Sequence, residues 1–274
     1  MVVSDLDGTL LDSGHALSEQ NRRTLDWLAE RGAVRVVATG RSWFSARQVL
    51  DDDFPIDFLI FSSGAGVIDW SSKALILAHD MRGDDALAVA GSLVARGLDF
   101  MLHHGIPDNH RFYFHRAGRD DNPDFEARCA RYRDFATPWP GESPSMERAS
   151  QLLVVEPAGV PSQFHDIAAS LPSQKVILTT SPLDHASRWI EIFPASVSKA
   201  NAATWLCERL GCDPRQVLAV GNDFNDLDLL DWAASARVVA NAPARLRETY
   251  ENVPSNDAHG FSRAVRDWVD GRAL

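Results

Sequence analysis

The sequence predicts an α/β protein in which a parallel-sheet core is interrupted by an inserted α+β domain. Short β-branched runs alternate with helix patterns at both ends of the 274-residue chain, whereas the middle has longer helices and polar loops. A repeated strand–helix order favours a parallel sheet with helices on both faces. The length suits two packed units better than one simple domain. We therefore expect a Rossmann-like core of residues 1–82 and 186–274, and a second domain of residues 83–185.

The core elements are predicted from apolar runs and from the residues at their boundaries. Ser18 is the expected N-cap of a helix ending at Arg31, and Gly32 is its expected stop. The other core helices are expected at 42–50, 198–210, 226–234 and 261–269. The core strands are expected at 1–4, 34–38, 58–61, 189–193, 217–220 and 238–240.

The inserted domain is predicted from the same kinds of pattern, separated by longer polar loops. Its helices are expected at 84–96, 124–133 and 163–171. Its strands are expected at 100–103, 112–115, 152–155 and 176–179. Because this part differs from the short rhythm of both ends, we interpret it as a separate α+β domain.

Composition and charge exclude several classes of protein. Apolar residues make up 45% of the chain, and it contains no run of about 18 of them that could span a membrane. The N-terminus lacks the features of a signal peptide, so we expect a cytoplasmic protein. The strand before Asp5 is short, which leaves open whether the N-terminus is complete. The net charge of −11 disfavours nucleic acid and anionic membranes as partners. It also repels phosphorylated substrates, so their site would need a metal or local cations.

The three cysteines, Cys129, Cys207 and Cys212, leave an odd thiol in any paired scheme. Reduced thiols are therefore expected. Cys207 and Cys212 lie in or beside an apolar helix pattern and have no second pair of ligands. We interpret them as packing residues and not as metal ligands.

The strongest functional signal is Asp5-Leu6-Asp7-Gly8-Thr9, which directly follows an apolar run. A strand followed by a glycine turn places both carboxylates at the strand's carboxyl end, where open α/β sheets build their sites. Two acids so spaced can divide the work of phosphoryl transfer: one attacks phosphorus and the other handles the leaving-group proton. Neither suits the core, because a buried unpaired carboxylate is costly. An exposed Asp-Gly turn is the alternative.

A hydroxyl and a lysine provide further groups for an anion. Thr39-Gly40-Arg41 follows the second expected strand and precedes a helix, whose N-terminal dipole favours a phosphate oxygen. Lys199 stands at the start of another helix, where the dipole disfavours a cation. A lysine placed there against that cost is expected to serve an anion. Taken singly, a structural turn and a solvated surface lysine are the alternatives.

A polar segment, Gly221-Asn222-Asp223-Phe224-Asn225-Asp226, lies between another expected strand and its helix. It supplies oxygen ligands, which Mg²⁺ prefers while it keeps several waters. A plain capping turn would need only one of these polar residues. We therefore expect the segment to contribute to a magnesium site at the end of the sheet.

Together these four pieces resemble the motifs of the haloacid dehalogenase superfamily. The segment Asp5–Thr9 looks like its first motif, Thr39 the second, Lys199 the third and Gly221–Asp226 the fourth. An insertion between the second and third motifs resembles the type C2 cap group. Ile190-Glu191-Ile192, followed by Pro194, is similar to the Cof-type, class IIB branch, which includes sugar-phosphate phosphatases. In that branch the fourth motif has an acid where this chain has Asn222, so the resemblance leaves open whether Asn222 or Asp223 binds the metal.

The resemblance implies a Mg²⁺-dependent phosphatase that acts on a small phosphorylated metabolite such as a sugar phosphate. Asp5 would attack phosphorus to form an aspartyl-phosphate, and Asp7 would protonate the leaving oxygen and then activate water. The implied metal-binding residues are Asp5, Asp7, Asn222 and Asp223. The implied phosphate-binding residues are Thr39, Gly40, Lys199 and Asn225, with Asp226 behind them to orient Lys199 or metal waters.

Weaker candidates and other functions stay open. Arg41 and Arg188 are candidate substrate contacts, each with a surface ion pair as the alternative. His103, His104, His110 and His115 lack clear ligand spacing, so we interpret them as core or surface histidines and not as a metal site. A phosphotransferase or phosphomutase could use the same aspartyl-phosphate. A dehalogenase would not need Asp7, and a non-catalytic binding protein would not need the acids. The sequence does not determine the oligomeric state.

Overall fold

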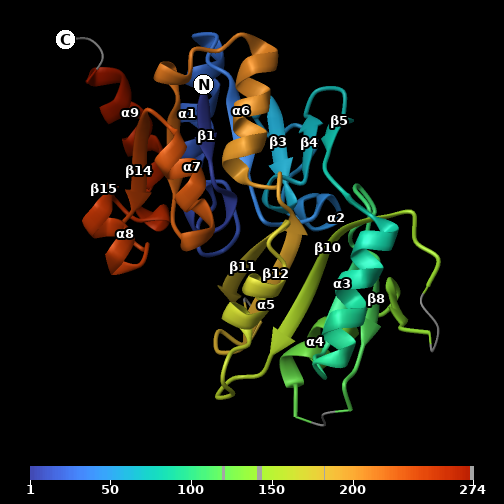
Figure 1. The fold of residues 1–274 in the computed structure, drawn as a ribbon. Helices are drawn as coiled ribbons and strands as arrows, with labels where there is room; N and C mark the ends of the chain where they lie inside the picture. The colour runs from blue at the N-terminus through green and yellow to red at the C-terminus, as the bar shows by residue number, and fades with distance from the viewer. Residues whose placement is uncertain (119–120, 141–143, 182, 272–274) are drawn as a thin grey trace. The chain divides into compact units, whose positions relative to one another are not determined.

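The structure, a computed structural model, describes residues 1–118, 121–140, 144–181 and 183–271 (Figure 1). Their contacts divide the chain into two compact units. The first unit consists of Met1–Arg41, Ser45–Leu77 and Ser198–Leu274, and the second of Ser42–Phe44 and Ala78–Val197. The second unit contains the whole of the expected insertion. None of the helices in the described residues is both long and apolar enough to cross a membrane.

The first unit is built on an eight-stranded sheet with the order β15-β14-β13-β1-β2-β3-β4-β5. Its strands are β1 (Val2–Ser4), β2 (Arg35–Ala38), β3 (Phe58–Phe61), β4 (Gly66–Asp69), β5 (Ala74–Ala78), β13 (Leu218–Gly221), β14 (Ser235–Val239) and β15 (Glu251–Val253). The strands from β15 to β3 are parallel, and β4 runs antiparallel to β3. Val3 lies between Val36 and Ala219 in the register. The carboxyl ends of β13, β1 and β2 therefore meet at one edge.

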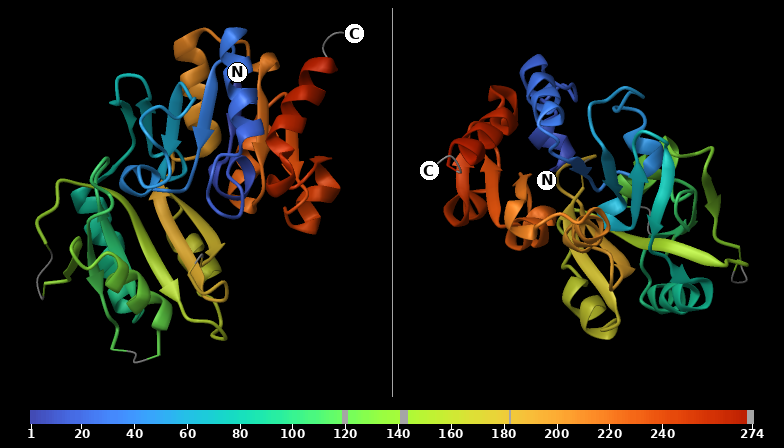
Figure 2. Two further views of the ribbon diagram at one scale, coloured as in Figure 1. Left: turned by 180° about the vertical axis from the view of Figure 1, so that it is seen from behind. Right: turned by 90° about the horizontal axis from the view of Figure 1, so that it is seen from above.

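Helices cover both faces of this sheet, as the strand–helix order predicted. They are α1 (Glu19–Glu30), α6 (Lys199–Leu210), α7 (Leu227–Trp232), α8 (Ala244–Thr249) and α9 (Gly260–Asp270), with the one-turn α2 (Trp43–Ala46) after β2. The pair α1 and α9 packs on one face, and the pair α6 and α7 on the other (Figure 2). The Ser18 hydroxyl accepts the Asn21 N–H, which confirms the expected N-cap of α1.

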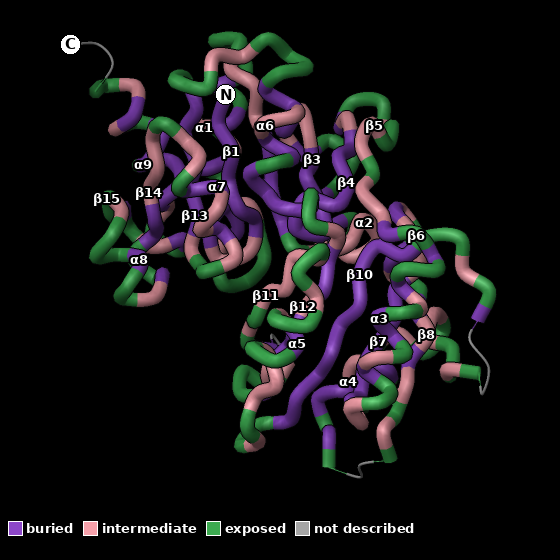
Figure 3. Tube along the Cα trace, viewed as in Figure 1, coloured by how far each residue is buried: buried purple, intermediate pink, exposed green. Residues whose placement is uncertain are grey.

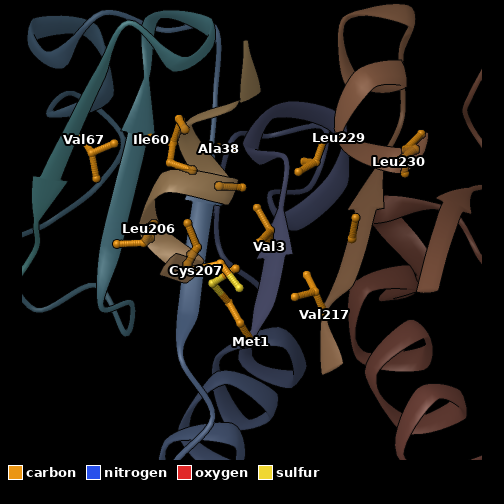
Figure 4. Close-up of a cluster of buried hydrophobic side chains, with 14 of the residues drawn as sticks. Met1, Val3, Ala38, Ile60, Val67, Leu206, Cys207, Val217, Leu229 and Leu230 are labelled. Atoms are coloured by element: carbon orange, nitrogen blue, oxygen red, sulfur yellow. The ribbon is translucent and has the colours of Figure 1, made fainter. Parts of the chain in front are cut away.

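A hydrophobic cluster joins the α6–α7 layer to the sheet. Val3, Ala38 and Ile60 point from the strands toward Leu206 and Leu229, and all five side chains are buried (Figure 4). Full burial of one such aliphatic side chain contributes about 1.5–3 kcal/mol. Cys207 belongs to the same cluster, and its thiol donates to the Cys212 carbonyl oxygen at 3.3 Å. The central strands are buried along most of their length (Figure 3).

Three core elements have other bounds than expected, and three strands were not expected. The helix expected at 42–50 is limited to the single turn of α2. Three aspartates, at 51–53, follow it, and acidic side chains at a helix C-terminus oppose its dipole. Strand β14 begins three residues before the expected 238, and the expected helix at 226–234 ends at Trp232. Strands β4, β5 and β15 were not expected, because Gly64 and Gly66 interrupt the apolar pattern and β15 has three residues.

The second unit has its own seven-stranded sheet with the order β11-β12-β10-β7-β8-β9, and β6 pairs with β10. Its strands are β6 (Met81–Arg82), β7 (Phe100–His104), β8 (Phe112–His115), β9 (Ala136–Pro138), β10 (Arg148–Glu156), β11 (Gln174–Thr180) and β12 (Arg188–Pro194). Its helices are α3 (Gly83–Ala95), α4 (Pro123–Arg131) and α5 (Phe164–Ser170). All the helices and strands expected within 83–185 are confirmed, with end shifts of a few residues.

Strand β12 lies in a different sheet from the one expected. Residues 189–193 were expected to return the chain to the core, but β12 pairs antiparallel with both β10 and β11 in the second sheet. Only residues 181–187 separate β11 from β12, and so short a connection joins antiparallel neighbours. The boundaries between the units accordingly fall at 77–78 and 197–198.

Four of the histidines in the inserted segment, at 103, 104, 110 and 115, each pack on an aromatic ring of the second unit. His104 lies on Tyr113, His110 on Phe135 and His115 on Phe100. His103 is 2% exposed, contacts Phe112, and donates from Nδ1 to the carbonyl oxygen of Asn109 at 2.7 Å. Burial, and then the positive charge of Arg128, lower the pKa of His103 from 6.5 to about 3. His103 is therefore a neutral core residue.

This buried histidine predicts a loss of stability in acid. Below pH 6.5 the unfolded chain binds a proton at residue 103 that the folded unit does not bind until about pH 3. The free energy of unfolding should thus fall as the pH drops through this window, by roughly 2 kcal/mol at pH 5 from this group. Denaturant unfolding of His103→Gln and of the wild type at pH 7 and pH 5 measures the difference. The loss of stability between pH 7 and pH 5 should be smaller in His103→Gln than in the wild type, and it should persist in His185→Gln, which changes an exposed histidine. Disappearance of the loss in His185→Gln would contradict the assignment to His103.

Candidate active site

The candidate site starts at Asp5, immediately after β1. The Asp5 N–H donates to the Val220 carbonyl oxygen at 2.9 Å, which continues the pairing of β1 with β13 by one residue. The Ser4 hydroxyl donates to the Asp5 carbonyl oxygen at 2.8 Å. Residue 5 is only 4% exposed, so its carboxylate needs a partner.

Lys199 is that partner, and it also contacts a second carboxylate. Its Nζ lies 2.7 Å from Oδ1 of Asp5 and 2.6 Å from Oδ1 of Asp226. All three side chains are buried. Lys199 is the first residue of α6, and the Ser198 hydroxyl caps the helix by accepting the Asn201 N–H. Lys199 was expected to bind a phosphoryl oxygen, and in the structure its partners are these two carboxylates.

Burial and charge set the pKa values of this triad. Burial raises the pKa of Asp5 from 3.8 to about 7, with the Lys199 charge acting against that rise and the Asp226 charge adding to it. Burial lowers the pKa of Lys199, but the carboxylates of Asp226 and Asp5 raise it by more, so its net shift is upward. Lys199 is therefore a permanent cation beside Asp5.

Asp226 links Lys199 to the loop after β13. Its Oδ2 accepts the N–H groups of Asn222, at 2.9 Å, and Asp223, at 3.2 Å. A Cβ added to Gly221 would lie 2.8 Å from Oδ2 of Asp226, so only glycine fits beside this carboxylate. Asp226 therefore orients both the lysine and the polar loop.

The turn that holds Asp7 lies against Asn222. Gly8 has φ +71°, a conformation that favours glycine, and an added Cβ would lie 2.7 Å from Nδ2 of Asn222. Asn241 closes the turn by donating to the Gly8 carbonyl oxygen at 2.8 Å. Asp223 is exposed instead, and its Oδ1 accepts the Phe224 N–H at 2.7 Å. The geometry thus brings Asn222, and not the Asp223 carboxylate, to the Asp7–Gly8 backbone.

The donor set fits a hard cation with few protein carboxylates. Among the described residues, no three His, Cys, Asp or Glu side chains gather to hold a metal. Beside the first motif, the Asp5 carboxylate follows β1, and the Asn222 amide lies against the Gly8 turn. Mg²⁺ takes one or two carboxylates and keeps several waters, so this set suits it.

The turn after β2 carries Thr39 and Gly40. The Thr39 hydroxyl accepts the Arg41 N–H at 3.1 Å, and the Thr39 carbonyl oxygen accepts the Ser63 N–H at 3.0 Å. A Cβ on Gly40 would lie 3.6 Å from the Ser63 hydroxyl and 4.0 Å from Nδ2 of Asn225. Oδ1 of Asn225 is buried and has no hydrogen-bond partner among the residues that the structure describes. Asn225 thus brings an unsatisfied amide to the turn expected to bind phosphate.

Asp7 is held by Arg41. Nε of Arg41 donates to one Asp7 oxygen at 2.7 Å, and Nη2 donates to the other at 2.6 Å. His15 makes a further contact, with Nδ1 3.3 Å from Oδ1 of Asp7. Arg41 therefore lies at the candidate site, because it contacts Asp7, a candidate catalytic residue.

Arg188 belongs to a different place. It opens β12 in the second unit, where its guanidinium lies 3.5 Å from the Glu156 carboxylate and donates to the Val160 carbonyl oxygen. These contacts give Arg188 a structural role within the second unit.

Three residues that support the site were not predicted from the sequence. His15 contacts Asp7, Ser63 contacts Thr39, and Asn241 closes the Gly8 turn. Ser62 and Ser63 both have positive φ, 49° and 56°. The only available signal was the polar Ser-Ser-Gly run directly after the apolar strand at 58–61.

The fold and the site define an α/β protein with a carboxylate, a lysine and an acidic turn at the carboxyl edge of a parallel sheet. The family model of the haloacid dehalogenase-like hydrolases matches residues 2–265. The chain therefore belongs to the haloacid dehalogenase-like hydrolase family, as the four motifs predicted.

Relatives match along the full chain. The 5-amino-6-(5-phospho-D-ribitylamino)uracil phosphatase YwtE of Bacillus subtilis (strain 168) is 25% identical over 299 residues, which cover 99% of this chain and 98% of that protein. The structure of SMU.1108c from Streptococcus mutans UA159 has a TM-score of 0.77 at 20% identity and 98% coverage of both chains. BT4131, a HAD subclass IIB sugar phosphatase, has a TM-score of 0.73 at 17% identity, covering 97% of this chain and 98% of that one. The expected fold class and the resemblance to the haloacid dehalogenase superfamily are confirmed.

Proposed function

We propose that this hydrolase is a phosphoric monoester hydrolase that acts on a small phosphorylated metabolite through an aspartyl-phosphate on Asp5. The observation that carries the proposal is the buried triad, in which Lys199 contacts both Asp5 and Asp226. A carboxylate held by a fixed cation at the end of a strand is oriented to attack an anionic phosphorus centre. The full-length relative YwtE, named as a phosphatase, supports the same reaction class.

The reaction has two steps that the residues of this chain can perform. First, an Asp5 oxygen bonds to phosphorus while the bond from phosphorus to the ester oxygen breaks. Asp7 gives a proton to that oxygen, and the alcohol leaves. Second, Asp7 takes a proton from a water whose oxygen attacks phosphorus, the bond to Asp5 breaks, and inorganic phosphate leaves. The sum is ester plus water to alcohol plus phosphate.

The phosphoryl oxygens would be bound by Thr39, Gly40, Lys199 and Asn225. Such donors lower the barrier by positioning and by neutralising charge. Mg²⁺ would be held by the Asp5 carboxylate, the Asp7 carbonyl oxygen and the Asn222 amide oxygen. When bound, it supplies further neutralisation of the phosphoryl charge.

We also propose that the second unit, the cap domain of the resemblance, selects the substrate. All the residues given a chemical role above belong to the first unit, so the phosphoryl group can be bound without the second. The name of YwtE describes a phosphorylated sugar-alcohol chain attached to a heterocycle, and a sugar phosphate or a similar monoester is the class we assign here. Phosphate release from a panel of sugar, sugar-alcohol and nucleotide monoesters tests both the reaction and this class.

Removal of the metal is expected to stop turnover. The side chain at position 222 is expected to determine how tightly the protein binds Mg²⁺. Excess chelator should abolish phosphate release, and added Mg²⁺ should restore it. Asn222→Asp adds a negative charge to the donor set, so it should keep or tighten Mg²⁺ binding as measured by calorimetry. Asp223→Asn, the matched change at the next residue, should leave the affinity nearly unchanged. Loss of Mg²⁺ binding in Asp223→Asn alone would assign the ligand to Asp223 instead.

A further inference from the structure

The exposure of Asp7 poses a problem for a group that transfers protons. Its side chain is 36% exposed and lies on a turn, whereas Asp5 is buried. An exposed carboxylate left to itself samples several rotamers. A general acid must lie within hydrogen-bond reach of one oxygen of the substrate, and a misplacement of about 1 Å can cost about a hundredfold in rate. A side chain in this position therefore needs something to hold it.

Arg41 holds both oxygens of Asp7. The two hydrogen bonds, 2.7 Å from Nε and 2.6 Å from Nη2, form a parallel pair that fixes the plane of the carboxylate. Arg41 itself is 19% exposed, and its Nη1 lies 3.4 Å from the Ser45 carbonyl oxygen and 3.3 Å from its hydroxyl. The guanidinium is thus anchored beyond its contact with Asp7.

The backbone of Arg41 belongs to the turn that is expected to bind phosphate. Its N–H donates to the Thr39 hydroxyl at 3.1 Å, and its carbonyl oxygen accepts the Ser62 N–H at 2.8 Å. The same residue therefore ties the acid–base group to the loop that would bind the phosphoryl oxygens. A shift of either would be transmitted to the other through the side chain of this one residue.

We infer that Arg41 is a positioning residue, which fixes the carboxylate of Asp7 relative to the phosphoryl site. The inference rests on the acid–base role of Asp7 in the proposed function and adds how that role is maintained on an exposed turn. Direct phosphate binding by Arg41 is the competing role. It is disfavoured because the paired donors Nε and Nη2 already contact the two Asp7 oxygens, which a phosphate would have to displace.

His15 adds a weaker second contact. Its side chain is 60% exposed, and one ring nitrogen lies 3.3 Å from Oδ1 of Asp7. It has φ +59°, and it stands in a loop shaped by Asp12, whose Oδ1 accepts the N–H groups of Gly14 and Ala16 at 2.9 Å. A single longer contact from an exposed ring fixes less geometry than a two-bond pair. Arg41 is therefore the residue to test.

The chain offers a matched control in the same unit. Arg35 also forms a two-bond pair, with Asp57, through Nε at 3.1 Å and Nη2 at 2.7 Å. The exposures of this pair, 14% and 36%, resemble those of Arg41 and Asp7, 19% and 36%. Arg35 begins β2 and Arg41 follows its other end, so Arg35→Gln removes an equivalent ion pair at the opposite edge of the sheet.

The test compares two esters that differ in their leaving group, phenyl phosphate and 4-nitrophenyl phosphate, across four proteins: wild type, Asp7→Asn, Arg41→Gln and the double variant. We expect Arg41→Gln to lower kcat by about tenfold to a hundredfold. Its kcat/KM should fall by a larger factor for phenyl phosphate than for 4-nitrophenyl phosphate. Phenolate is the more basic leaving group, so its departure depends more on protonation by Asp7. In the Asp7→Asn background, Arg41→Gln should cost less than about twofold, because effects that act through one group are not additive.

The other outcomes separate the possible explanations. An increase in KM that is equal for both esters and persists in the Asp7→Asn background would overturn the inference in favour of phosphate binding. An equal loss in Arg35→Gln would overturn it in favour of a structural effect. Arg41→Lys, which can contact only one oxygen well, should recover part of kcat; full loss with Lys but not with Gln would contradict the inference. Wild-type turnover in Asp7→Asn would instead refute the acid–base role in the proposed function.

Discussion

Asp5→Asn is expected to abolish phosphate release while the first unit stays folded. An amide is a poor nucleophile, so turnover should fall by roughly 10⁴-fold or more. The fold should survive, because the Asn side-chain oxygen can still accept the hydrogen bond from Lys199, which lies 2.7 Å from the native carboxylate. Steady-state phosphate release, with mass spectrometry to exclude deamidation back to Asp, measures the loss.

Two further measurements make this result specific. Acid quenching during turnover should trap one phosphoryl group on the wild-type protein and none on Asp5→Asn. Asp69→Asn, which changes a turn acid bonded to Ser71 and Ser72 in the same unit, should keep turnover within about twofold, as expected for a surface site away from special features. A trapped phosphoryl group that passes to an added alcohol faster than to water would identify a phosphotransferase instead of a phosphatase.

The parts of the site that could be predicted from the sequence are those that follow strands. Asp5, Thr39 and Asn222 each come directly after an apolar run, and parallel pairing of β1, β2 and β13 brings such positions to one edge. Lys199 could be predicted because a cation at a helix start is locally unfavourable. At these positions, the residues that end a strand or begin a helix are also the residues that the parallel fold brings together. The local sequence pattern was therefore enough to predict them.

The rest depends on contacts that the local pattern does not encode. Arg41 was weighed as a substrate contact or a surface ion pair; its partner is Asp7, 34 positions away, and that depends on side-chain direction. Strand β12 has an apolar run that would suit either sheet, and only the short connection from β11 determines which one it joins. The choice between Asn222 and Asp223 depends on a cap: Asp223 bonds the Phe224 N–H and stays exposed.

Lys199→Met should remove both activity and a large part of the stability of the first unit. The ammonium lies between two carboxylates at 2.7 and 2.6 Å, and all three groups are buried. Without the cation, the two acids remain buried without their partner, which typically costs about 3–5 kcal/mol. Loss of a fixed positive charge beside the phosphoryl group should also lower kcat/KM by roughly 10²-fold or more. Lys73→Met, at a partly exposed lysine over Trp70, is the control and should change the unfolding midpoint less than Lys199→Met.

A double-variant cycle separates the electrostatic explanation from simple loss of packing. If buried charge causes the instability, Asp5→Asn should be less harmful, or even stabilising, in the Lys199→Met background, since it removes one of the two uncompensated carboxylates. If the cause were only the shape of the methionine side chain, the two changes would add independently. Chemical denaturation of the four proteins at pH 7 gives the coupling energy. Strict additivity, or a Lys199→Met protein as stable as the wild type, would show that Lys199 does not hold the two acids together.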